Sequence, residues 1–218
     1  METWEDFVHQ SHDLGAALTE CVAYQTYDDS DRIKLSDVLA SLAFEHSHSA
    51  RVLLEAGLLP SALVVHRSQF ETVLRSLWAL YGASDELVAK LCTELTLETE
   101  VASKNIPMAA KMMEDLAIKA PPNAYKPLHE FKTHSWGALN SYVHAGIHPI
   151  RRHAEGYPLE LLVNVMKNVN GLMVVTAMQA AILTGVPNLQ RKVLEVANRF
   201  PHVLSPVPLS NGSNPSAS

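Results

Sequence analysis

Cysteine is scarce in this sequence, and its scarcity excludes two classes of small protein. The chain has 2 cysteines in 218 residues, Cys21 and Cys92, which lie far apart and outside any Cys-x-x-Cys pattern. Both lie in amphipathic segments, where a cysteine behaves as a small apolar side chain. We therefore expect neither a disulfide framework nor a cysteine-ligated metal site.

An excess of basic residues is also missing. The 17 Lys and Arg residues are outnumbered by 23 Asp and Glu residues, and the formal net charge is −6 at pH 7. Broad, sequence-independent binding to nucleic-acid phosphates needs an excess of positive charge on one face. The composition argues against that class of protein but leaves room for a local basic patch.

No apolar run reaches the length of a membrane span. The longest, GLMVVTAMQAAILTGV at 171–186, contains Gln179 and two threonines. It falls short of the roughly 18–20 residues that cross a bilayer, and no signal-peptide pattern appears at the start of the sequence. We therefore predict a cytoplasmic protein without a membrane partner, in which this run forms a buried core helix.

Helical periodicity recurs along the chain, and no alternating pattern typical of strands appears. With 47% hydrophobic residues, the chain has enough apolar surface to bury a core. Helices are predicted at about residues 4–24, 31–57, 60–82, 107–116, 135–146 and 158–183. A further helix begins after a cap at Ser84, and a last helix ends near Phe200. We expect APPNAYKP at 120–127 to be the clearest break and Ser135 to start the next helix.

These segments predict an all-α fold, a bundle of four to five long helices with short helices at its periphery. Residues 1–200 form a single domain in this interpretation. The remaining segment, 201–218, contains four prolines and little apolar surface, so we predict a disordered tail.

The third predicted helix carries an arginine within its apolar face. At 100° per residue, Arg67 falls inside the arc formed by Leu63, Phe70, Leu74, Leu77 and Tyr81. Glu71 and Arg75 follow at four-residue steps, so Glu71 is the nearest partner for Arg67. One interpretation is a structural Arg67–Glu71 pair; the other is an anion-binding arginine in a cleft between helices.

His46 projects from a leucine face on the second predicted helix, which contains Leu35, Leu39, Leu42 and Leu53. The turn at 57–60 is short, so the second and third helices should be antiparallel neighbours. At 1.5 Å per residue, His46 and Arg67 then differ in level by about one turn. We predict that His46, Arg67 and Glu71 line one polar pocket.

The segment YVHAGIHPIRRH at 142–153 concentrates three histidines and two arginines. His144 and His148 have the four-residue spacing of zinc-binding helices, but Gly146 and Pro149 favour a helix end here and a break at His148–Pro149. No acidic residue lies between the two histidines to act as a base. We expect no metal and no cofactor at this segment.

A second metal pattern is incomplete. Glu45 and His48 have the Glu-x-x-His spacing of di-iron bundles, but both point away from the leucine face and a second such motif is missing. A metal-dependent bundle enzyme therefore has little support from the sequence. Elemental analysis of the purified protein tests this hypothesis.

The segments HRSQFETVLRSLWALYGASDE at 66–86 and YVHAGIHPIRRH at 142–153 together resemble a family. It is the family of uncharacterised bacterial helical-bundle proteins allied to the HEPN superfamily (higher eukaryotes and prokaryotes nucleotide-binding domains). The matching residues are Arg67, Ser68, Glu71, Ser141, Tyr142, His144, His148 and Pro149. The resemblance implies an α-helical bundle, homodimers, and RNA-directed roles in toxin–antitoxin and antiphage systems. Nuclease members share an Arg-x4–6-His motif that this chain lacks, which leaves the fold and a binding role but puts cleavage in doubt.

A metal-independent ribonuclease needs a base, an acid and a cation that stabilises the phosphorane. Here His144 is the candidate base, His148 the acid and Arg67 the phosphate clamp. Seven further residues are candidates for substrate binding: His46, Glu71, Arg75, Ser141, Tyr142, Arg151 and Arg152. The structural alternative is a solvated polar corner at 142–153.

The leading hypothesis is a dimeric, HEPN-like protein that binds nucleic acid or a nucleotide in bacterial stress or phage defence, with a protein partner encoded nearby. The alternative, from a different class, is a non-catalytic dimeric interaction module in which the Arg67–Glu71 pair is structural.

Overall fold

The computed structural model describes residues 3–94, 96, 99 and 106–205. Over these residues the chain forms nine α-helices and one short 3-10 helix, without a strand, which confirms the predicted all-α class. The elements are α1 (Trp4–Cys21), α2 (Asp31–Glu55), α3 (Leu59–Tyr81), α4 (Asp85–Leu91), α6 (Ala109–Lys119), α7 (Pro122–Val143), α8 (Ile147–Glu155), α9 (Leu159–Thr184), α10 (Leu189–Ala197) and η2 (Pro201–Val203).

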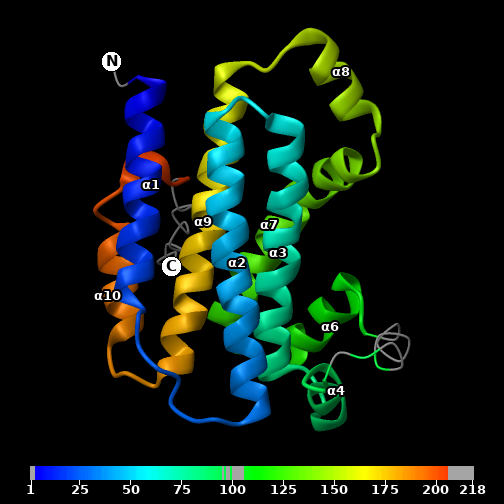
Figure 1. Ribbon diagram of the computed structural model, residues 1–218, viewed down its shortest axis with the longest axis vertical. Helices are drawn as coiled ribbons and strands as arrows, with labels where there is room; N and C mark the ends of the chain where they lie inside the picture. Colours follow the sequence, from blue (N-terminus) through cyan, green and yellow to red (C-terminus); the bar gives the residue numbers. More distant parts are fainter. Residues whose placement is uncertain (1–2, 95, 97–98, 100–105, 206–218) are drawn as a thin grey trace, which may run out of the picture.

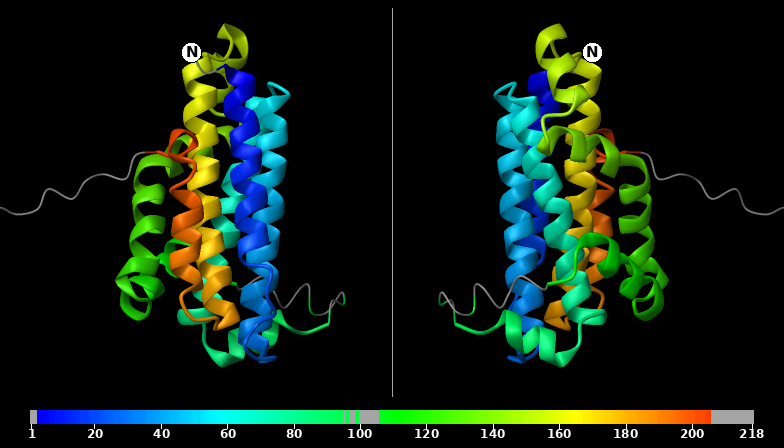
Figure 2. Two further views of the ribbon diagram at one scale, coloured as in Figure 1. Left: turned by 90° about the vertical axis from the view of Figure 1, so that its left-hand side faces the viewer. Right: turned by 90° about the vertical axis from the view of Figure 1, so that its right-hand side faces the viewer.

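Five of these helices are long and run along the bundle: α1, α2, α3, α7 and α9 (Figure 1). The shorter α4 and α6 lie beside one end of α3, whereas α8 lies at the opposite end and connects α7 to α9. Figure 2 shows α7 on the face of the bundle opposite α1 and α2. The predicted arrangement of long helices with short peripheral ones is confirmed.

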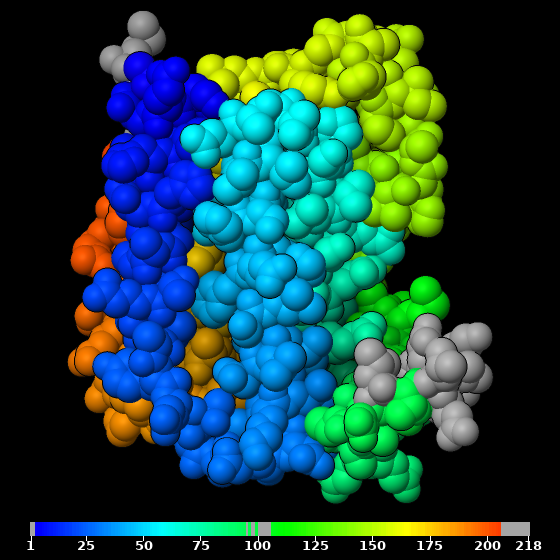
Figure 3. Space-filling model, viewed as in Figure 1, coloured from blue at the N-terminus to red at the C-terminus, as the bar shows by residue number. Residues whose placement is uncertain are grey.

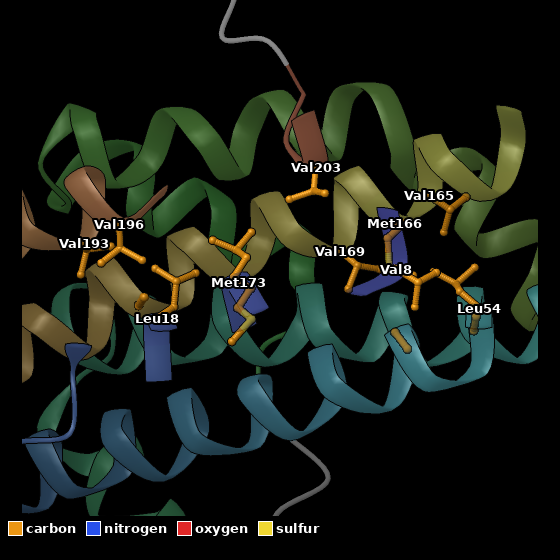
Figure 4. Packing of buried hydrophobic residues seen from close by; sticks show 14 of the residues in the cluster. Val8, Leu18, Leu54, Val165, Met166, Val169, Met173, Val193, Val196 and Val203 are labelled. Atoms are coloured by element: carbon orange, nitrogen blue, oxygen red, sulfur yellow. The ribbon is translucent and has the colours of Figure 1, made fainter. Parts of the chain in front are cut away.

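Helix α9 forms the centre of the larger apolar core. Its side chains Val165, Met166, Val169 and Met173 pack against α1, α2, α10 and η2 (Figure 4). Within the described residues α9 alone is long and apolar enough to cross a membrane by length and composition, a test that core helices of soluble proteins also pass. It packs against α3 as well, and its place among five neighbouring elements agrees with the predicted core helix.

Helix α2 buries its small side chains, which corrects the predicted leucine face. The buried residues are Ile33, Ser36, Ala40, Ala43, Ser47, Ala50, Arg51 and Leu54. Leu35, Leu39 and Leu53 are only half-buried and Leu42 is exposed. Small residues let α2 approach α3 closely. Ser36 and Ser76 then exchange side-chain to backbone hydrogen bonds of 2.9 and 2.7 Å.

The predicted break at 120–127 is confirmed at residues 120–121, between α6 and α7, but it is shorter than predicted, because α7 begins at Pro122 and continues through the predicted start at Ser135. Pro122 lies in its first turn, where a missing N–H costs nothing, and Pro127 is accommodated inside the helix. The chain next breaks at 144–146, where Ala145 has a φ of 49°. Pro149 lies in the first turn of α8, so the predicted break at His148–Pro149 is wrong.

The packed part of the chain extends beyond the predicted boundary at residue 200. Pro201–Val203 form η2, and Val203 is buried and accepts a 3.0 Å hydrogen bond from Asn170 Nδ2. Most of the predicted tail, residues 206–218, lies outside the described residues.

Candidate functional site

A cavity of about 660 Å³ lies between α3, α6 and α7. We call it the α3–α6–α7 cavity. Its lining consists of Arg67, Glu71, Arg75, Ile106, Pro107, Met108, Ala109, Ala110, Met112, Lys132, Trp136, Asn140 and His144. In the space-filling view the surface is indented between the α7–α8 region and α6 (Figure 3).

The polar lining comes from two helix stripes with a four-residue step. Arg67, Glu71 and Arg75 form the stripe on α3, because residues four apart lie on one helix face. Lys132, Trp136, Asn140 and His144 form the corresponding stripe on α7 and its C-cap. Contact between α3 and α7 brings the two stripes to adjoining walls of the cavity, where Arg67 meets Trp136.

Arg67 is the most constrained side chain of the cavity, with 17% of its side chain exposed. Its Nε and Nη2 donate to Glu71 Oε1 at 3.3 and 3.0 Å. Its guanidinium lies 4.8 Å from the centroid of the Trp136 ring. The remaining nitrogen, Nη1, is buried and has no hydrogen-bond partner. One donor of the guanidinium is therefore left without a partner.

Cations outnumber carboxylates in the lining. Arg67, Arg75 and Lys132 face the single carboxylate of Glu71. Among the described residues neither Arg75 nor Lys132 has an ion-pair partner within 4.0 Å. Burial lowers the pKa of Arg75, and the charge of Glu71 acts in the opposite direction. The surplus of positive charge suits an anion, and phosphate or carboxylate groups fit guanidinium donors.

The cavity also has an apolar wall. Ile106, Pro107, Met108 and Met112 line it on the α6 side, opposite Trp136. The Trp136 ring is held by an edge contact with Phe70, at a centroid distance of 5.5 Å. Helix α6 begins at Ala109 without a side-chain cap, so its first N–H groups and its positive dipole end lie at this wall. Such a surface accepts a planar ring next to an anionic group.

Hydrogen bonds from α6 to the bundle set the width of the cavity. Trp78 Nε1 donates to Asp115 Oδ2 at 3.1 Å, and Lys111 pairs with the same carboxylate at 2.8 Å. At the other end of α6, Lys119 Nζ donates to the Gly82 carbonyl at 2.7 Å. Two polar contacts therefore fix the short helix against the end of α3, and the Lys111–Asp115 pair within α6 orients the carboxylate that makes the first of them.

Four of the predicted site residues meet in this cavity: Arg67, Glu71, Arg75 and His144. His144 is an exposed residue of its rim. His46 does not line it. That histidine is half-buried on α2, and α2 packs against the side of α3 that carries Ser76. The structure therefore does not bring His46 into the cavity that Arg67 and Glu71 line.

The remaining predicted residues belong to the corner between α7 and α8. Ser141 Oγ accepts a 3.3 Å hydrogen bond from the His148 backbone N–H, and the rings of Tyr142 and His148 stack at 6.4 Å. Arg151 pairs with Glu155 at 2.8 Å. Neither His148, the predicted acid, nor Arg151 or Arg152 lines the cavity, so the predicted catalytic set is only partly brought together.

Three cavity residues were missed by the sequence reasoning: Lys132, Trp136 and Asn140. They share a four-residue step with His144, which the predicted helix at 135–146 already contained for Trp136 and Asn140; only Lys132 requires the longer helix α7. As for metals, no group of three or more His, Cys, Asp or Glu side chains suited to hold an ion occurs in the described ranges.

The fold and the cavity define an all-α bundle protein with a cationic cavity between helices. The chain belongs to a family described as a family of unknown function, DUF6988, whose model matches residues 40–206. The matched segment contains every residue of the α3–α6–α7 cavity. No curated protein and no solved structure matches the chain significantly. The family match gives no link to the HEPN superfamily, and that resemblance stays a prediction.

Proposed function

We propose that the protein binds a nucleotide-like small molecule, a phosphate joined to a planar base, in the α3–α6–α7 cavity. One observation carries the proposal: among the described residues, the guanidinium of Arg67, two cations without an ion-pair partner and a half-buried tryptophan line one cavity that holds a single carboxylate. A volume of about 660 Å³ lies within the range of small-molecule sites, roughly 300–1,000 Å³.

The phosphate is assigned to the α3 stripe and Lys132. Arg67 is held by Glu71 and Trp136, so its guanidinium loses little side-chain freedom when an anion binds. Arg75 and Lys132 add charge at the neighbouring positions of the two stripes. The base is assigned to the apolar wall between Trp136 and Met108, where a flat ring displaces water from apolar surface.

Isothermal titration calorimetry with AMP, adenosine and ribose 5-phosphate tests the assignment, because the last two probes lack the phosphate and the base respectively. AMP should bind at least tenfold more tightly than either. Arg75→Gln and Lys132→Gln should each weaken AMP binding about 10-fold, the effect of one lost charge-assisted hydrogen bond. Arg151→Gln, an exposed and paired arginine outside the cavity, should bind AMP like the wild type.

Equal affinity for AMP and adenosine, or unchanged binding by both Arg75→Gln and Lys132→Gln, contradicts the proposal. A protein that binds none of the probes at millimolar concentration contradicts it as well.

Metal-independent RNA cleavage is a second candidate, favoured by the presence of His144 beside Arg67 in one cavity. In it His144 takes the proton of the 2′-hydroxyl, whose oxygen attacks the phosphorus, and Arg67 stabilises the phosphorane. The P–O5′ bond then breaks, the 5′-oxygen takes a proton from water, and a 2′,3′-cyclic phosphate remains. Loss of cleavage of a short RNA in both His144→Ala and Arg67→Ala, with folding retained, supports it. Unchanged cleavage in both variants eliminates it.

The homodimer, the partner protein encoded nearby and the role in stress or phage defence remain proposals. Light scattering of the purified protein tests the first of them: a mass near twice 23.9 kDa supports a dimer, and a mass near 23.9 kDa contradicts it.

A further inference from the structure

A second cavity lies on the other side of α2, between α1 and α2, with a volume of about 630 Å³. We call it the α1–α2 groove. Arg51 of α2 and Met173 of α9 belong to its lining, together with Gly15 and Ala16 of α1. It shares no residue with the α3–α6–α7 cavity, and α1 and α7 lie on opposite faces of the bundle (Figure 2).

Arg51 is almost completely buried, with 3% of its surface exposed. Its Nη1 donates to Ser47 Oγ at 2.9 Å and contacts Met173 Sδ at 3.0 Å, and both partners are neutral. Its Nε is buried without any partner. Burial lowers the pKa of Arg51 to about 10, so the guanidinium remains charged at neutral pH.

The arginines that do form ion pairs show what Arg51 lacks. Arg32, Arg67, Arg151 and Arg191 each have a carboxylate oxygen within 2.7–3.5 Å. All four are more exposed than Arg51. Among the described residues no carboxylate lies within 4.0 Å of Arg51, although a buried charge needs a partner most. The groove carries one acidic lining residue, Glu20, which is exposed.

The sequence of α1 is adapted to this guanidinium. A Cβ atom at Gly15 would lie 2.5 Å from Arg51 Nη2, so only glycine lets α1 pass this close. The glycine therefore keeps the charged end of Arg51 between α1 and α2, at the inner side of the groove. His12 and His48 flank the groove with rings 6.1 Å apart, and His12 Nε2 lies 3.2 Å from Glu55.

We infer that the α1–α2 groove is an anion-binding site, in which Arg51 takes a small oxyanion, a carboxylate or a phosphate group. The guanidinium offers donors in a fork that matches two oxygens of such a group. The bound anion supplies the missing counter-charge, and the imidazoles of His12 and His48 stand beside it as further polar contacts. The inference does not rest on the proposed nucleotide site.

Thermal unfolding with inorganic phosphate and with acetate, each against chloride at constant ionic strength, tests the inference. Because phosphate is also expected in the α3–α6–α7 cavity, the measurement uses the Arg75→Gln variant. At least one oxyanion should raise the Tm in a saturable manner, since a ligand of the native state stabilises it.

Ala16→Leu is the decisive second variant, because Ala16 is exposed and lines the groove without contacting the core. It should abolish the anion-dependent rise in Tm. Ala117→Leu, an exposed alanine on α6 outside both cavities, should preserve the rise. Arg51→Met should also lose it; if that variant does not fold, Ala16→Leu still decides.

Two outcomes overturn the inference: no oxyanion-dependent change in Tm, or an equal change in Ala16→Leu. A spectroscopic readout locates the anion independently. Phosphate should shift the imidazole NMR signals of His12 and His48 and leave those of His129, an exposed histidine of α7, in place. Shifts at His129 alone would contradict the site.

Discussion

Arg67 combines a fixed position with a donor that the protein itself does not use. Glu71 and Trp136 hold the guanidinium from two sides, and Nη1 stays unpaired. Because Glu71 is 39% exposed, removing Arg67 does not leave a fully buried carboxylate behind. The structural hypothesis for the pair and the binding hypothesis therefore differ in the size of the effect on stability.

Arg67→Ala should lower the free energy of unfolding by only about 1 kcal/mol, the sum of a half-exposed ion pair and a cation–π contact. The same change should weaken AMP binding by more than tenfold. Urea unfolding and calorimetry measure the two quantities. Glu71→Gln is the matched control for the lost ion pair, since it keeps a neutral partner for Arg67. A loss of several kcal/mol in stability would favour the purely structural pair.

His66 is a second residue whose surroundings predict a measurable property. It is 1% exposed, its Nδ1 pairs with Gln69 Oε1 at 2.9 Å, and its ring meets Phe131 edge-on at 5.2 Å. Burial lowers the pKa of His66 to about 4, from 6.5 for the free side chain. The unfolded chain therefore binds the extra proton between these two pH values, and the folded chain does not.

Stability should consequently fall as the pH falls from about 6.5 to about 4, and His66 should account for about 3 kcal/mol of that loss. Urea unfolding of the wild type and of His66→Gln across this range gives the two slopes. The variant should have the shallower slope, whereas the exposed His129→Gln should keep the wild-type slope. Parallel curves for His66→Gln and the wild type would contradict the buried neutral imidazole.

At the scale of helices, local pattern predicted half of the cavity. A charge inside an apolar arc is a local signal, and it identified Arg67, Glu71 and Arg75 on α3. The α7 stripe was not predicted as a whole. Pro127 and Ser135 suggest a helix break and a helix start, respectively, which separates Lys132 from the other members of the stripe. Helix α7 nevertheless continues through both, since packing of Leu128 and Leu139 into the core outweighs one missing hydrogen bond.

The prediction of a buried leucine face on α2 was wrong for a related reason. Hydrophobic periodicity ranks leucine above alanine and serine, whereas close contact between helices selects small residues. Sequence periodicity alone does not reveal which neighbour a helix will meet, or at what distance. The position of α6 likewise depends on contacts between distant residues, Trp78 with Asp115 and Lys119 with Gly82.

Two neighbouring positions on α2 test the corrected face. Ala43 is 0% exposed and belongs to the core, whereas Leu42 is 38% exposed. Ala43→Leu should cost about 1–3 kcal/mol of stability through overpacking, although it adds apolar surface. Leu42→Ala should cost less than about 1 kcal/mol, because the leucine is only partly buried. A larger loss of free energy of unfolding in Leu42→Ala than in Ala43→Leu would support the originally predicted leucine face instead.

The attachment of α6 is testable through Asp115, which joins Trp78 and Lys111. Asp115→Ala leaves the buried Trp78 N–H unpaired, so we expect a loss of about 1–2 kcal/mol. Hydrogen exchange should accelerate in the α6 amides, and AMP binding should weaken because the apolar wall loosens. Glu114→Ala, which removes only a 3.9 Å surface pair with Lys111, should leave all three properties unchanged. Unaltered exchange in Asp115→Ala would show that α6 is held by its apolar side alone.

For the whole molecule, the contrast between net charge and cavity charge decides which ligands can bind. The chain carries a net charge of −6, whereas three cations and one carboxylate line the α3–α6–α7 cavity, which is of limited size. A polyanion longer than the cavity is repelled by the net negative charge of the molecule. The molecule as a whole therefore favours one nucleotide over a long RNA tract.

Salt dependence distinguishes these two ligands. A site that neutralises one phosphate should lose only a few-fold in AMP affinity between 50 and 200 mM salt, whereas contacts to six or more phosphates cost about 10³-fold or more. A single-stranded RNA oligonucleotide should bind with the same shallow slope as AMP, since one nucleotide at a time occupies the α3–α6–α7 cavity. Arg75→Gln should weaken both ligands equally. If the oligonucleotide instead binds with a steep slope and without dependence on Arg75, its contacts lie on another surface, and the nucleotide assignment loses its basis in charge.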